Sequence, residues 1–462
     1  MSTTALVHAT HPPLPPVLGT WNPFGHVFRF RDDPLALFLE GQAKGDVVRM
    51  RVGPMYINAV YSAEAVSHVL IERQGNYVKQ TRGYKQLRKI LGNGLLTAEG
   101  AEWKRNRRIA QPAFQHRRIA GFADIMERAT LDLADRWARA DGEIVDVAEA
   151  MNQLTLRIAG ETLFSMDISG DSDEVGNALS DMLGGFLPTI TNPLLAMFPT
   201  PSRTRMRRGH ATLDHVVRDI IARRRLQDPD GKNTEDLLGM FMAARDEDGH
   251  GMSDEQLRDE VLTMLLAGHE TTANALAWTF WHLANNPEAA DKLREEVDGL
   301  SGPLLERYPK LAWTGQVLDE SMRLTPPAWA ESRMALEDDV IGGFHIPAGS
   351  FVFMPQYAIH RNPKYWADPE RFDPTRFGPG PHLCPDGSPR PRQAFVPFGD
   401  GQRKCIGEHF AKMEARIVLS ELARRFRVEA LPGQTVGMEP TVTLRPRGGL
   451  PMRVVRRKPS LR

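Results

Sequence analysis

The stretch from Phe398 to Gly407 reads FGDGQRKCIG and contains Cys405, one of the 2 cysteines in the chain. Its glycines let the backbone turn tightly around the sulfur, and Arg403 places a fixed positive charge two residues before it. Helical periodicity follows Gly407, so we expect Cys405 where a glycine-rich loop enters a helix. Backbone N–H groups at such a point stabilise a thiolate, which can serve as a nucleophile, a redox thiol or a metal ligand.

The alternatives for Cys405 differ in what else they require from the chain. A buried structural cysteine requires nothing and is the default for an isolated cysteine. A redox pair needs a close partner, but Cys384 lies about twenty residues upstream, which is not a C-x-x-C spacing. Zinc needs further Cys or His ligands, and His409 alone is not enough. Haem iron needs only one thiolate as its axial ligand.

A second candidate group, AGHETT at 267–272, lies in the middle of a helix predicted from a capping box at Ser253 to Asn285. That helix would span roughly 50 Å. Glycine and threonine are locally unfavourable inside a buried helix, and a rule broken in a well-formed element indicates a functional site. Small side chains leave room for a ligand, and a threonine hydroxyl can interrupt the helical hydrogen bonds. The alternative is a core helix with a benign kink.

Two pairs at helical spacing could also carry function. Trp103 and Arg107 share one helix face within a segment rich in lysine and arginine. A solvated basic helix is the simpler interpretation; the other is a site for an anionic cofactor, since arginine binds carboxylates bidentately. Glu320 and Arg323, in a helix predicted over 311–324, form either a surface pair of little energetic consequence or a buried network.

The elements that must position these residues are mostly helices. Short strands are predicted at 47–52 and 55–60, around the turn at Gly53-Pro54, and a hairpin is predicted at 340–349. Strand-like alternation returns over 437–455. The remaining periodic segments favour helices.

Composition excludes several classes of protein. Lys+Arg and Asp+Glu both number 58, so the net charge of +0 argues against wholesale binding of nucleic acid. The 2 cysteines in 462 residues argue against a disulfide framework and for a reducing compartment. The first twenty residues are proline-rich and lack a signal-peptide pattern, and no long apolar run occurs elsewhere. We expect a soluble, cytoplasmic protein without a membrane anchor.

The cysteine loop resembles the haem-ligand loop of the cytochrome P450 superfamily, F-x-x-G-x-R-x-C-x-G, through Phe398, Gly401, Arg403, Cys405 and Gly407. The other three groups resemble the same superfamily's A/G-G-x-D/E-T, W-x-x-x-R and E-x-x-R motifs. The resemblance implies a fold that is mainly α with small β-sheets (α+β). It would be one large triangular fold, with haem b between the long central helix and the cysteine loop. We divide the chain into a proline-rich lead at 1–30 and a single catalytic domain at 31–462.

The resemblance also implies roles for individual residues. Cys405 would be the iron ligand, and Glu270 and Thr271 would relay protons to dioxygen. The implied haem-binding residues are Trp103, Arg107, Ala267, Gly268, Arg333, Phe398, Arg403 and Gly407. Glu320 and Arg323 would form a buried structural network with Arg371. The expected substrate-pocket residues are Leu91, Leu95, Leu96, Phe186, Leu265, Ala328, Trp329 and Val442. The apolar segment 184–198 would be a mobile lid or a plain connection.

The implied reaction inserts one atom of O2 into a hydrophobic substrate by hydroxylation or epoxidation. Fatty acids, terpenoids, steroids and macrocycles are all allowed, with motif details nearer to a branch rich in fatty-acid hydroxylases. Electrons would come from a separate ferredoxin or flavodoxin and an NAD(P)H-dependent reductase. Such an acidic partner would dock on basic residues of the thiolate side, namely Lys104, Arg105, Lys404, Lys412 and Arg416. Alternatives are a peroxygenase, a non-oxygenating isomerase or dehydratase, and a haem-binding sensor.

Overall fold

Helices make up most of the computed structural model, which describes residues 12–166, 200–230, 232–245 and 249–457, together with 175, 176, 178, 179, 181 and 182. The helices are α1 Val27–Asp32, α2 Pro34–Gln42, α3 Ala63–Ser67, α4 Arg82–Leu91, α5 Gly100–Ala110, α6 His116–Gly121, α7 Ala123–Arg139, α8 Val147–Leu163, α11 Pro201–Gln227, α12 Leu237–Ala243, α13 Asp254–Asn285, α14 Pro287–Asp298, α15 Leu304–Arg307, α16 Ala312–Leu324, α17 Gln356–Ile359 and α18 Glu408–Arg425. Among these helices, none has both the length and the apolar character needed to cross a membrane.

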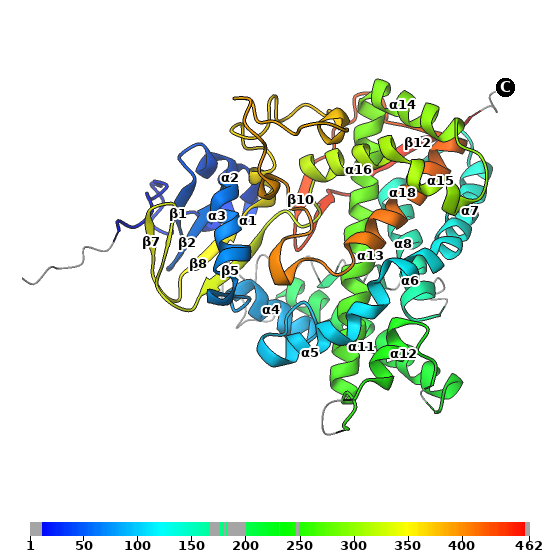
Figure 1. Ribbon diagram of the computed structural model, residues 1–462, viewed down its shortest axis with the longest axis horizontal. Helices are drawn as coiled ribbons and strands as arrows, with labels where there is room; N and C mark the ends of the chain where they lie inside the picture. Colours follow the sequence, from blue (N-terminus) through cyan, green and yellow to red (C-terminus); the bar gives the residue numbers. More distant parts are fainter. Residues whose placement is uncertain are drawn as a thin grey trace, which may run out of the picture.

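The strands are short and lie in four small sheets of the described chain. They are β1 Val47–Val52, β2 Met55–Val60, β3 Tyr77–Val78, β4 Ile144–Asp146, β5 Glu331–Ala335, β6 Asp339–Ile341, β7 Phe344–Ile346, β8 Phe351–Met354, β9 Phe426–Glu429, β10 Met438–Pro440, β11 Leu444–Pro446 and β12 Pro451–Arg456. The largest sheet has the order β1-β2-β8-β5-β3 and lies to one side of the helices (Figure 1). The predicted class, mainly α with small sheets, is confirmed.

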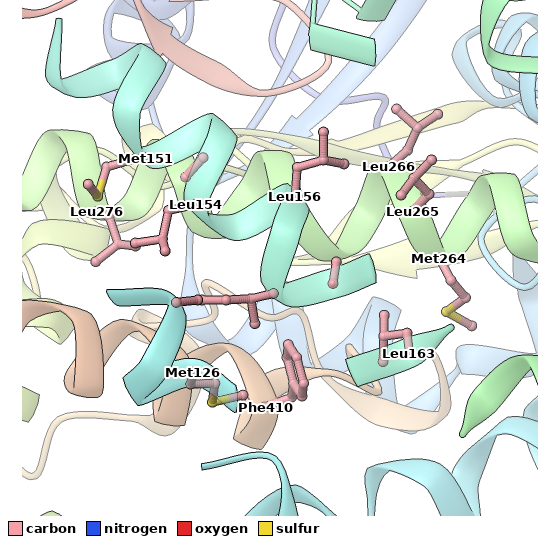
Figure 2. Packing of buried hydrophobic residues seen from close by; sticks show 14 of the residues in the cluster. Met126, Met151, Leu154, Leu156, Leu163, Met264, Leu265, Leu266, Leu276 and Phe410 are labelled. Atoms are coloured by element: carbon pink, nitrogen blue, oxygen red, sulfur yellow. The ribbon is translucent and has the colours of Figure 1, made fainter. Parts of the chain in front are cut away.

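The long helix α13 is the spine of the helical part. It begins at the predicted capping box, where the Ser253 hydroxyl accepts from the Gln256 N–H at 3.1 Å and the Gln256 side chain accepts from the Ser253 N–H at 3.0 Å. It packs against α8, and side chains of both helices meet Phe410 of α18 in one core (Figure 2). Most residues of α13 are buried, so its position is held from several sides.

The β1–β2 hairpin also forms where the sequence predicts it, with Val52 opposite Met55 across the turn. β8 joins β2 in parallel, and β5 then pairs with β8. The boundary expected at residue 30 falls inside α1, where Phe30 is buried against the sheet residue Phe353 at a ring distance of 6.1 Å. The division into a lead and a catalytic domain stays a prediction.

Candidate active site

The cysteine loop is shaped by close backbone contacts. The Cys405 N–H donates to the Phe398 carbonyl at 2.9 Å. Gly401 has φ +67°, and a Cβ there would lie 1.8 Å from the Leu70 carbonyl oxygen, so only glycine fits this position. The Cys405 side chain is exposed to the cavity. The surrounding protein still limits its contact with solvent and raises the pKa of the thiol, while the Gly407 N–H and the charge of Arg107 oppose that rise. The loop therefore presents one sulfur, with its supporting donors, immediately before α18 begins.

A cavity of about 460 Å³ lies between this loop and α13, and most of the predicted site residues line it. Those brought together are Leu91, Leu95, Leu96, Trp103, Arg107, Ala267, Gly268, Glu270, Thr271, Ala328, Trp329, Phe398, Arg403, Cys405, Gly407 and Val442. Their positions in the chain run from α4 to the turn between β10 and β11. The fold thus gathers distant motifs around one largely apolar space.

Two predicted pocket residues are not brought to this cavity. Leu265 is fully buried in the core that α13 shares with α8, as Figure 2 shows, and is absent from the cavity wall. Its neighbours Met264 and Leu266 line the wall instead. Phe186 lies outside the described residues, as does the whole of the expected lid at 184–198.

Cationic side chains gather at one end of the cavity. The Arg403 guanidinium carbon lies 4.0 Å from the centre of the Trp103 ring. One of its terminal nitrogens donates to the Ala98 carbonyl at 2.9 Å and also meets the Glu99 carboxylate, whereas the other is buried and has no partner in the described chain. Arg107 donates to the Lys404 carbonyl at 3.0 Å. Arg403 therefore keeps one buried donor without a partner, and a negatively charged group bound in the cavity could accept from it.

Lys79 belongs to the same cluster of cationic side chains. The sequence did not indicate it as a site residue, because it lies in none of the motifs. Its side chain is buried, lines the cavity and donates to the Leu96 carbonyl at 3.3 Å. Burial, with the nearby charges of Arg333 and Arg403, lowers the pKa of Lys79 to about 7. A buried lysine held by a carbonyl favours an anionic ligand that would restore its charge. These residues fit the two carboxylates of haem.

Arg333 occupies a different position from the one its predicted role suggests. It is buried but does not line the cavity, and its guanidinium donates to the Glu331 carboxylate at 2.9 Å and the Ser332 carbonyl at 2.9 Å. Its charge still reaches Lys79. Direct binding of haem by Arg333 stays a prediction.

The side chains of Glu270 and Thr271, both on α13, form hydrogen bonds with different partners. The Thr271 hydroxyl donates to the Ala267 carbonyl at 2.8 Å and remains accessible from the cavity. The Glu270 side chain is buried, and its Oε1 accepts from the Thr443 hydroxyl at 2.6 Å. Burial raises the pKa of Glu270, which the hydrogen bond from Thr443 and the charge of Arg445 oppose. The link from Glu270 to Thr443 crosses 173 residues of sequence and has no sequence signal.

The Glu320–Arg323 pair is buried and bidentate, with N···O distances of 2.7 and 2.8 Å and neither side chain exposed. The predicted third member was misidentified. Arg371 is exposed and contributes only its backbone carbonyl, to Arg323 at 3.1 Å, whereas the Arg376 guanidinium lies 3.5 Å from Glu320. Both arginines lie in one irregular segment, so sequence spacing did not indicate which of them turns inward.

Comparison with known proteins agrees with this geometry. The family description "Cytochrome P450" matches residues 12–450. The chain is 35% identical to cyclooctatin synthase of Streptomyces melanosporofaciens, covering 91% of both chains, and 34% identical to cyclooctat-9-en-7-ol 5-monooxygenase of the same organism, covering 89% of both. It is 33% identical to pentalenene oxygenase of Streptomyces avermitilis, covering 94% of both. The protein belongs to the cytochrome P450 family, an oxygenating family that binds haem b through a cysteine thiolate.

Proposed function

We propose that the protein uses O2 and electrons from a reductase system to hydroxylate or epoxidise a cyclic terpenoid. The observation that carries the proposal is one apolar cavity whose wall includes both Cys405 and the pair Glu270–Thr271. The relatives named for pentalenene, cyclooctatin and cyclooctat-9-en-7-ol favour terpenoids over the fatty acids that motif details suggested. A cytoplasmic location is part of the proposal, supported by two free cysteines.

The residues of the site divide the work as follows. Cys405 would supply the thiolate ligand of the haem iron, while Arg403, Arg107 and Lys79 would hold the haem carboxylates. Haem, when bound, activates O2 so that one oxygen atom enters the substrate and the other leaves as water. Thr271 holds a hydroxyl at the cavity wall, and Glu270 is the adjacent proton-exchanging group. Leu95, Trp329 and other apolar residues exclude water from the substrate side.

The first test combines two absorption measurements on purified, haem-loaded protein. With dithionite and carbon monoxide, a strongly red-shifted Soret band is expected for a thiolate ligand. Titration with a panel of cyclic terpenoids and fatty acids should give type I shifts for terpenoids at the lower concentrations. A response to fatty acids alone would overturn the substrate class, and turnover with hydrogen peroxide but not with O2 and reductase would favour a peroxygenase.

The ion pairs and contacts of the predicted basic residues support a smaller docking face for an electron-transfer partner than the one expected from the sequence. Lys404 and Lys412 both pair with Glu408, at 2.5 and 3.3 Å. Arg416 donates to the Leu311 carbonyl and stacks on Tyr308, so its charge is turned into the fold. On α5, the exposed residues Lys104 and Arg108 have no ion pair within the described chain. We place the contact with an acidic ferredoxin or flavodoxin on these two cations.

Charge reversal tests this docking face. Lys104→Glu together with Arg108→Glu should lower reductase-supported turnover at least about 10-fold at low salt, because steering of an acidic partner is lost. Added salt should slow the parent protein but have little further effect on the double variant. Lys44→Glu, an exposed residue just after α2, is the matched control and should resemble the parent. Equal salt dependence in all three proteins would exclude the proposed face.

A further inference from the structure

The turn between β10 and β11, residues 441–443, contacts both the cavity and α13. Thr441, Val442 and Thr443 all line the cavity wall. The Thr443 hydroxyl lies between two residues of α13, donating to Glu270 Oε1 at 2.6 Å and accepting from the Asn274 amide at 3.3 Å. Residues four apart share a helix face, so Glu270 and Asn274 present an acceptor and a donor side by side. The single hydroxyl of Thr443 therefore forms a hydrogen bond with each of these two side chains.

The direction of these two hydrogen bonds determines which protonation state of Glu270 is favoured. Because Asn274 donates to the hydroxyl oxygen, the hydroxyl hydrogen is left for Glu270. A donated hydrogen bond stabilises the charged carboxylate over the acid. The other charge acting on Glu270 is Arg445 of β11, itself paired with Glu439 of β10 at 2.7 Å. Within the described residues, the two groups that oppose the effect of burial on the pKa of Glu270, Thr443 and Arg445, therefore both come from this hairpin.

The turn is anchored to the substrate side as well. The Trp329 indole donates to the Thr441 carbonyl at 3.0 Å, and the Thr441 hydroxyl donates to the Thr443 carbonyl at 3.0 Å. The Leu444 N–H donates to the Pro327 carbonyl at 2.9 Å. Trp329 and Val442 both line the cavity. A substrate that packs on these two side chains would thus touch the same three-residue turn that holds Glu270.

We propose that Thr443 is a positioning residue for Glu270, and that the β10–β11 turn couples substrate contact at Val442 and Trp329 to the position and proton affinity of that carboxyl group. The catalytic role of this coupling rests on the proposed function, whereas the hydrogen bond between Thr443 and Glu270 does not. Thr443 fixes Glu270 turned toward the hairpin, while Thr271 stays on the cavity side. Coupling between O2 consumption and product then depends on a residue that lies 173 positions from Glu270 in the sequence.

The test compares Thr443→Val with Thr443→Ser, which keeps the hydroxyl. Infrared spectra across pH, with Glu270→Gln used to assign the carboxyl band, report the protonation of Glu270 without any turnover. In Thr443→Val the band of the protonated acid should persist to a pH about 1 to 2 units higher, as loss of one hydrogen bond to a charged group implies. Thr443→Ser should restore the parent titration. A bulky terpenoid should shift the titration in the parent but not in Thr443→Val.

Turnover provides the second readout. In Thr443→Val, the amount of product formed per O2 consumed should show a pH profile shifted in the same direction as the infrared titration. The substrate concentration needed for the type I spectral shift should change little. Thr435→Val, at an exposed position before β10 and outside the cavity wall, is the matched control and should leave both pH profiles in place. Identical Glu270 titrations in Thr443→Val and the parent would overturn the proposal. If the infrared shift occurs but no variant oxygenates any substrate, the proposed function fails and the positioning role stands.

Discussion

Replacing Cys405 by serine should abolish oxygenation and remove the red-shifted Soret band of the reduced carbon monoxide complex. Loss of residues that merely support a metal ligand costs about 10- to 100-fold in metal affinity or activity, so loss of the ligand should cost more. Serine is close in size, and the Gly407 N–H and the backbone hydrogen bond to Phe398 would remain. The measurement is the absorption spectrum, followed by product formation with O2 and reductase.

Cys384 is the matched control for this substitution. It is the other cysteine of the chain, buried in the same core cluster as Trp366, and it does not line the cavity. Cys384→Ser should keep the parent spectrum and activity. A Cys405→Ser protein that retained the red-shifted band would mean that another residue ligates the iron, and the assignment of the cysteine loop would fail.

Replacing Glu320 by alanine should prevent stable, haem-loaded protein from accumulating. The carboxylate makes two hydrogen bonds with Arg323, accepts the Asp373 N–H at 2.7 Å and lies beside Arg376. Its removal leaves the fully buried guanidinium of Arg323 without a counter-charge. Stranding a buried charge in this way costs about 3–5 kcal/mol, a large share of the total stability of about 5–15 kcal/mol typical of folded proteins.

Two arginines near Glu320 give an internal comparison. Arg376→Ala should lower the denaturant midpoint and the haem-to-protein ratio in the same direction as Glu320→Ala, because its guanidinium faces the same carboxylate. Arg371→Ala removes only an exposed side chain and should change stability by less than about 0.5 kcal/mol. Fully haem-loaded Glu320→Ala protein with the parent's denaturant midpoint would contradict a structural role for the network.

Much of the fold follows from local patterns. The capping box at Ser253 fixes where α13 begins, and strand propensity around Gly53-Pro54 is enough to locate β1 and β2. The glycines around Cys405 likewise predict tight turns in the loop, and Gly401 takes a positive φ of +67°. Such features depend on neighbours in sequence, so the sequence alone predicts them.

The errors have equally specific causes. α13 is apolar on nearly every side, so periodicity does not show that Leu265 faces the α8 core while Met264 and Leu266 face the cavity. Lys79 becomes a buried site residue only because distant segments enclose it. The contact between Glu270 and Thr443 likewise depends on tertiary structure. The surroundings of these residues depend on which helices and strands pack together in the fold. Patterns within one amino-acid sequence do not contain that information.

The cavity wall also determines when haem can enter during synthesis. Trp103 and Cys405, which both line the cavity, are separated by roughly 300 residues, a delay of about 15–60 s at ordinary rates of translation. The β10–β11 turn that holds Glu270 is made later still. Until then α5 and α13 leave their cavity-facing apolar side chains uncovered on the nascent chain. Haem loading is therefore a late event in the life of the chain, and the exposed intermediate is the species most at risk of aggregation when haem supply or folding assistance falls short.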